Sequence, residues 1–137
     1  MNGLPSGSPA QVPVLALGSL LLVTLQGELY DGTAEQLQSD LTERIAHSHV
    51  TGVVIDISGV EIVDSFLGRI LAEIASSARL LATRTVVAGM RPAVAITLVE
   101  LGLTLPGLDT ALDVERALAL LGHGSAPAPS VPAWEDA

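Results

Sequence analysis

Asp64 and Ser65 follow the pattern of a buried strand and begin a long amphipathic stretch of the chain. The order strand, short turn, helix puts the Ser65 hydroxyl at a helix start. Backbone N–H groups without an intrahelical acceptor and the positive end of the helix dipole meet there, so added negative charge is tolerated. This placement favours phosphorylation of Ser65. The alternative is an ordinary N-cap or first-turn serine, which stabilises a helix by roughly 0.5 to 2 kcal/mol.

Three acidic residues, Asp56, Glu61 and Asp64, surround the same strand-to-helix loop. A pair of carboxylates could perform acid–base chemistry. However, a position at the strand end for Asp56 and a role as helix N-cap for Asp64 explain two of them structurally. We expect their effect to be electrostatic. A phosphate on Ser65, with about −1.5 to −2 charges, would add to this negative potential and weaken the binding of any partner packed over Phe66.

Other kinds of chemistry have little support in the sequence. The three histidines, His47, His49 and His123, have no spaced carboxylate or thiol cluster to complete a metal site, so a solvated loop is the expected environment of the first two. Neither a phosphate-binding glycine motif nor the Gly-x-Ser-x-Gly motif of hydrolases is present. We therefore predict no enzymatic activity, no metal site and no cofactor.

The composition indicates one small domain that binds proteins. A chain of 137 residues suits a single core, and with 49% hydrophobic residues but one each of Phe, Tyr and Trp that core must be aliphatic. The net charge of −9 argues against nucleic acid or an anionic membrane as the main partner. The apolar run 12–25 is too short to span a bilayer and has no basic flank, and cysteine is absent. We expect a cytoplasmic protein.

Apolar periodicity predicts the elements of the first half. Two short apolar runs around Gly18-Ser19 indicate an opening β-hairpin. Leucine and isoleucine at four-residue spacing indicate a surface helix, and a β-branched run indicates a buried strand. The predicted ranges are 14–17 and 20–25 for the hairpin, 33–47 for the helix and 50–57 for the strand.

The second half alternates in the same way. From Ser65 one apolar stripe runs to Leu81, a strand follows at 83–87, and Pro92 begins a helix that stops at Gly102. A short edge strand is expected near 105–108, before a last helix at about 112–121. The order predicts an α/β fold with a mixed, mostly parallel sheet flanked by helices. Residues 12–121 form this domain, while 1–11 and 122–137 have the composition of disordered tails.

The segment Asp56-Ile57-Ser58-Gly59, followed by Val63-Asp64-Ser65, resembles the phosphorylation loop of STAS domains, the anti-sigma factor antagonist family. The resemblance spans residues 13 to 121. Simple sigma-factor antagonists usually carry Asp-Ser-Ser-Gly, whereas here Phe66 and Leu67 follow Ser65. In these residues after Ser65, and in the segment 89–97, the chain is similar to the single-domain STAS proteins of the bacterial stressosome, the RsbS type.

This resemblance implies that a switch kinase of the RsbT type phosphorylates Ser65. It also implies co-assembly with RsbR-like STAS proteins into a large scaffold that holds the kinase until stress, a phosphatase that resets the system, and compatibility with homo-oligomers. Thr97 falls where RsbR-like proteins have a second phosphorylatable threonine, so it is a weaker candidate. The residues expected to contact a partner are Asp56, Gly59, Glu61, Asp64, Phe66 and Arg91.

Three alternatives stay open. A direct anti-sigma factor antagonist would bind an anti-sigma kinase one to one instead of entering a very large particle. A STAS module for a small ligand or nucleotide would show saturable binding to the purified protein. An acid–base enzyme built on Asp56 and Asp64 would lose its activity in Asp64→Ala and keep it in Ser65→Ala.

Overall fold

The computed structural model describes residues 12–27, 31–60, 64–103 and 107–122 of the chain. Within these ranges, five strands form one sheet in the order β1-β2-β3-β4-β5. The elements in chain order are β1 (Val14–Leu17), β2 (Leu20–Gln26), α1 (Asp31–His47), β3 (Gly52–Gly59), α2 (Ser65–Leu80), β4 (Arg84–Ala88), α3 (Pro92–Glu100), β5 (Asp109–Ala111) and α4 (Val114–Leu120).

The sheet is mixed and mostly parallel. β1 and β2 form an antiparallel hairpin in which Leu17 pairs with Leu20 across the turn, and Gly18 supplies the positive φ of +61° that this turn needs. β2, β3, β4 and β5 pair in parallel. This confirms the predicted α/β fold with its opening hairpin.

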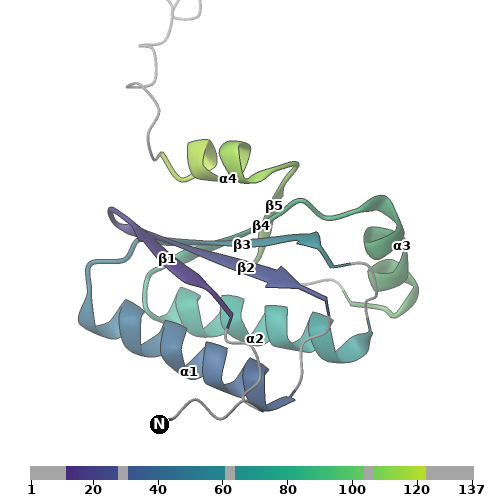
Figure 1. Ribbon diagram of the computed structural model, residues 1–137, viewed down its shortest axis with the longest axis horizontal. Helices are drawn as coiled ribbons and strands as arrows, with labels where there is room; N and C mark the ends of the chain where they lie inside the picture. Colours follow the sequence, from purple (N-terminus) through teal and green to yellow (C-terminus); the bar gives the residue numbers. More distant parts are fainter. Residues whose placement is uncertain (1–11, 28–30, 61–63, 104–106, 123–137) are drawn as a thin grey trace, which may run out of the picture.

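The helices lie in two layers and at one end of the sheet (Figure 1). α1 and α2 cover one face, and α4 covers the other. α3 lies beyond the end toward which the β2 and β3 arrows point, which is the carboxyl end of the parallel strands. The start of α2 lies at this same end, because α2 follows β3 after a short connection.

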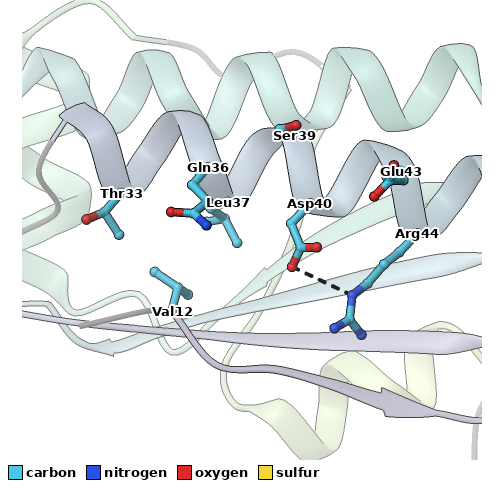
Figure 2. Close-up of a pocket in the computed structure, with 8 residues that line it drawn as sticks. All are labelled: Val12, Thr33, Gln36, Leu37, Ser39, Asp40, Glu43 and Arg44. Atoms are coloured by element: carbon cyan, nitrogen blue, oxygen red, sulfur yellow. Dashed lines mark ion pairs between the residues drawn. The ribbon is translucent and has the colours of Figure 1, made fainter. Parts of the chain in front are cut away.

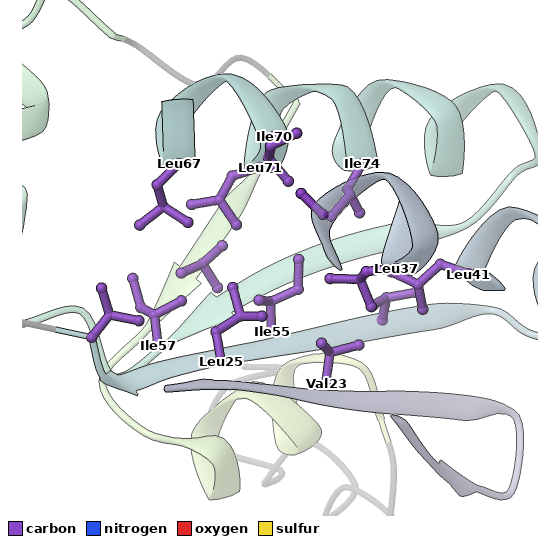
Figure 3. Close-up of a cluster of buried hydrophobic side chains, with 14 of the residues drawn as sticks. Val23, Leu25, Leu37, Leu41, Ile55, Ile57, Leu67, Ile70, Leu71 and Ile74 are labelled. Carbon is purple, nitrogen blue, oxygen red and sulfur yellow. The ribbon is translucent and has the colours of Figure 1, made fainter. Parts of the chain in front are cut away.

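The core is aliphatic and larger on the side of α1 and α2. In β3, Ile55 and Ile57 point to these helices, whereas Val54 points to α4, as alternation along a strand requires. Figure 3 shows Leu67, Ile70, Leu71 and Ile74 of α2 above Val23 and Leu25 of β2 and the two isoleucines of β3. The cluster beneath α4 has four fully buried members: Val54, Val86, Ala88 and Ala117.

The edge strand differs from its predicted position. We expected it near 105–108, but β5 is Asp109–Ala111, and residues 105 and 106 lie outside the described ranges. Gly107 adopts a φ of +79° and turns the chain just before the strand. The segment that pairs with Val86–Ala88 has three residues, two of them polar, so a search for apolar runs misses it.

Other boundaries differ by one or two residues. β3 spans 52–59 instead of 50–57, because its last residues still pair with β2 near Gln26. The first helix begins at Asp31 instead of Thr33. The last helix begins at Val114 instead of Leu112, because Asp113 is its N-cap and accepts a hydrogen bond from the Arg116 N–H at 2.8 Å.

The ends of the chain are described in part. The predictions for residues 1–11 and 123–137 lie outside the described residues, while Gly122 follows α4 with a φ of +81°. Within the described ranges, no helix combines the length and apolar character that crossing a bilayer requires.

Candidate phosphorylation and partner-binding site

α2 is capped by Asp64, which lies in an extended conformation with φ −127° and ψ 179°. Its Oδ1 accepts a hydrogen bond from the Leu67 N–H at 3.0 Å, which confirms the predicted N-cap. Ser65 is the first helical residue and is exposed. Because the aspartate already caps the helix, Ser65 is not the N-cap, and its hydroxyl lies at the open first turn.

An aromatic ring and a guanidinium flank this serine. Phe66 is half-buried and packs against the larger core cluster. Arg69 is exposed, and its Cζ lies 5.9 Å from the centre of the Phe66 ring, in the range of a cation–π contact. The first turns of α2 thus present a hydroxyl, one partly exposed ring and one positive charge next to each other.

The end of β3 is fixed to the start of α3. Oδ1 of Asp56 accepts a hydrogen bond from the Ser58 N–H at 3.0 Å, and the Arg91 Nε donates to the Ser58 carbonyl at 2.9 Å. Gly89 lies against this strand end with a φ of +76°, and a Cβ there would come within 2.8 Å of the Ser58 Cβ. Glycine is therefore required where β4 leaves the sheet.

The start of α2 also packs closely against α3. Gly68 is buried, and a Cβ at this position would overlap Cδ1 of Leu103 and lie 3.3 Å from Cδ2 of Leu98. The absence of a side chain lets α3 and the turn after it approach α2 one turn below Ser65. The two helices that begin at the carboxyl end of the sheet are thus in direct contact.

The predicted site residues fall into two groups at this end of the molecule. Asp56, Gly59 and Arg91 belong to the junction of β3 and α3, whereas Asp64, Ser65 and Phe66 belong to the start of α2. We expected Asp56 at the end of β3. It lies inside the strand instead, because the strand continues to residue 59. Glu61 lies outside the described residues.

Thr97 has a local role in α3. It is half-buried, and its hydroxyl donates to the Ala93 carbonyl at 2.9 Å one turn earlier. Its role as a second acceptor of phosphate stays a prediction.

Sequence reasoning missed Ser58, Gly68 and Arg69. The contacts of Ser58 and Gly68 join segments far apart in the chain, so no local pattern indicates them. Arg69 is different, because it follows Ser65 by four residues and Phe66 by three, the spacings at which side chains meet on a helix.

The described part of the chain also has a cavity away from this site. A cavity of about 420 Å³ lies between the start of β1 and α1, with Val12 facing Thr33, Gln36 and Asp40 across it (Figure 2). The Asp40–Arg44 ion pair, at 3.6 Å, borders it. None of the predicted site residues that the structure describes lines this cavity.

Metal-binding groups do not cluster in the described ranges. No three His, Cys, Asp or Glu side chains there are placed to hold one ion. His47 ends α1 and lies with Nδ1 3.0 Å from the Glu43 carbonyl oxygen, and His49 is exposed in the turn that follows.

Comparison with known proteins gives a family match and full-length structural neighbours. The family model of the STAS domain matches residues 11–117. RsbT co-antagonist protein RsbRD of Bacillus subtilis is 31% identical over 101 residues, which are 74% of this chain and 36% of that protein. The chain spans about two fifths or less of the length of the first four curated relatives that it matches.

Two solved structures are similar over almost their whole length. A serine-to-glutamate variant of RsbS from Moorella thermoacetica is 40% identical with a TM-score of 0.73, and the match covers 82% of this chain and 96% of that one. A structure described as the molecular architecture of the stressosome, a signal integration and transduction hub, is 41% identical with a TM-score of 0.71. That match covers 80% of this chain and 96% of the other.

Proposed function

The chain belongs to the STAS domain family, and from this premise we propose that it is a non-catalytic scaffold protein of a bacterial stressosome. In this proposal it sequesters a switch serine/threonine kinase of the RsbT type and releases that kinase when Ser65 is phosphorylated under stress. Its partners in the assembly are RsbR-like STAS proteins, and a phosphatase restores the unphosphorylated state in the cytoplasm.

The observation that carries the proposal is the exposed Ser65 at the first position of a helix capped by its neighbour. The Asp64 carboxylate engages the Leu67 N–H. Helix geometry gives the N–H groups of Ser65 and Phe66 no intrahelical acceptor, and the helix dipole is positive there. A kinase can therefore reach the hydroxyl, and the product phosphate is locally stabilised.

Phosphorylation of Ser65 should release the partner because it changes the charge next to the apolar contact at Phe66. A partner that covers the exposed part of Phe66 also has to cover Ser65, one residue before it. Phosphorylation adds about −1.5 to −2 charges beside Asp64, which a partner could bury only at a high desolvation cost. Partner binding at this surface is therefore favourable when Ser65 is unmodified and unfavourable when it is phosphorylated.

The partners are proposed from the relatives. The similarity to RsbRD, named an RsbT co-antagonist, and to the stressosome structure supports assembly with RsbR-like proteins and capture of an RsbT-type kinase. The 40% identity over 96% of the Moorella RsbS chain supports the role of the small, single-domain component.

The test is the size of the kinase-containing particle before and after ATP. The full chain is co-purified with an RsbR-like protein and an RsbT-type kinase and passed over a sizing column. We expect the kinase in a very large particle, from which Mg²⁺ and ATP release it, while Ser65→Ala keeps it bound. A one-to-one complex with an anti-sigma kinase and no large particle would instead favour the direct antagonist.

A further inference from the structure

We propose that Arg69 receives the phosphate of phosphorylated Ser65 and leaves the ring of Phe66 when it does so. The inference rests on the proposed function, because it takes Ser65 as the modified residue. It adds a second part to the switch: the docking surface loses a guanidinium and gains an uncovered ring at the same time as Ser65 gains its charge.

The helix geometry places the two groups together. Ser65 and Arg69 are exposed residues four positions apart on α2, so they lie one above the other on the same face. An anion that precedes a cation by four residues is the favourable order, because it also agrees with the helix dipole. A phosphate on Ser65 extends this side chain further and shortens the gap to the guanidinium.

Arg69 has no stronger partner to give up. In the described part of the chain its one recorded contact is the Phe66 ring, and no carboxylate pairs with it. Four of the other five arginines are already engaged. Arg44, Arg84 and Arg116 form ion pairs with Asp40, Asp109 and Asp113, and Arg91 donates to the Ser58 carbonyl.

The two possible contacts of the guanidinium differ in strength. A solvent-exposed cation–π contact is weak, whereas hydrogen bonds between a guanidinium and a phosphate are charge-assisted and can be bidentate. Arg69 is exposed in the present structure, so it moves between the two without being taken out of water. The phosphate is therefore expected to displace the ring.

The first test is a ³¹P NMR titration of the full chain with phosphoserine encoded at position 65 during translation, so that no kinase is needed. Arg69 should lower the pKa of the phosphate, because a nearby cation favours the dianion. We expect the equilibrium constant for protonation of the phosphate dianion to be about threefold lower in the wild type than in Arg69→Gln, with Arg69→Lys between them. Arg79→Gln, in the last turn of the same helix, is the matched control and should leave it unchanged.

The second test follows the arginine itself. In the unphosphorylated chain the δ protons of Arg69 should be shifted upfield by the Phe66 ring, and this shift should vanish with phosphoserine at position 65. Equal protonation constants in the wild type and Arg69→Gln, or an upfield shift that persists, would overturn the proposal. Because the phosphate is built in during translation, these outcomes do not depend on whether a kinase modifies Ser65. Failure of this proposal can therefore be told apart from failure of the proposed function.

Discussion

The helices α2 and α4 begin in the same way but present different chemistry. In each, an aspartate with an extended backbone accepts a hydrogen bond from the N–H three residues later. Asp64 accepts from Leu67 at 3.0 Å, and Asp113 accepts from Arg116 at 2.8 Å. Both helix starts are therefore stabilised by the same capping interaction.

The side chains around the two caps differ. At α4 the first residue, Val114, is half-buried against the smaller core cluster, and the Arg116 Nη1 lies 2.8 Å from the Asp113 carboxylate. At α2 the first residue is the exposed Ser65, and Arg69 lies over a ring instead of a carboxylate.

This difference shows which groups the fold itself uses. At α4 the apolar residue, the acid and the arginine all contribute to local structure. At α2 the aspartate caps the helix and Phe66 packs against the core, whereas the serine and the arginine are available to a kinase and to the phosphate that it transfers.

The largest difference should come from the cores on which the helices pack. Leu71 of α2 is fully buried in the larger cluster, whereas Leu118 of α4 is partly buried against the smaller one. We expect Leu71→Ala to lower the free energy of unfolding by about 3 kcal/mol and Leu118→Ala by about 1 kcal/mol. Urea denaturation measures both, and equal losses would show that α4 is as much a part of the core as α2.

The second comparison concerns charge at the start of α2. We expect Ser65→Asp to weaken capture of the RsbT-type kinase at least about tenfold, or about 1.4 kcal/mol, because it places a carboxylate in the docking surface. Ser65→Ala should keep the kinase bound. Ser76→Asp is the matched control, since Ser76 is exposed on the same helix three turns away. A similar loss in Ser76→Asp would mean that net charge, and not the helix start, governs capture.

The third comparison removes the caps. Asp64→Ala and Asp113→Ala should each lower the free energy of unfolding by about 1 kcal/mol, because each leaves an N–H of the first turn without its acceptor. The matched controls are Asp64→Asn and Asp113→Asn, which should keep most of the stability because asparagine also caps helices. A silent Asp64→Ala would contradict the structural role given to this carboxylate.

The smallest effects should come from the exposed arginines. Arg116→Gln breaks a surface ion pair with Asp113 and should cost at most about 0.5 kcal/mol, less in high salt. Arg69→Gln should change the stability of the unphosphorylated chain equally little, because its ring contact is exposed. Thermal melts at low and high salt should separate the two, and a salt-dependent loss in Arg69→Gln would reveal an ion pair that the structure does not show.

Much of the fold could be predicted from the sequence, because apolar periodicity reports burial directly. The stripe from Ser65 to Leu81 and the β-branched run of β3 led to elements of the right type. β5 was misplaced because its three residues, Asp109, Thr110 and Ala111, form no apolar run and the strand is defined by its pairing with β4. Pairing between distant strands leaves no local pattern in the chain.

The candidate site was predictable in part for the same reason. The capping role of Asp64 follows from its residue type and place, and the structure agrees. The contact of Arg91 with the Ser58 carbonyl and the fit of Gly89 against that strand end depend on segments about thirty residues apart. Such contacts become visible only when the strands are placed side by side.

Locating the phosphate on the chain shows whether Ser65 is the residue that the kinase modifies. The full chain is incubated with an RsbT-type kinase, Mg²⁺ and ATP, and the phosphorylated residue is located by mass spectrometry. We predict a single phosphate on Ser65 and no incorporation in Ser65→Ala. A phosphate on another residue, such as Thr97, with Ser65 unmodified would contradict the account.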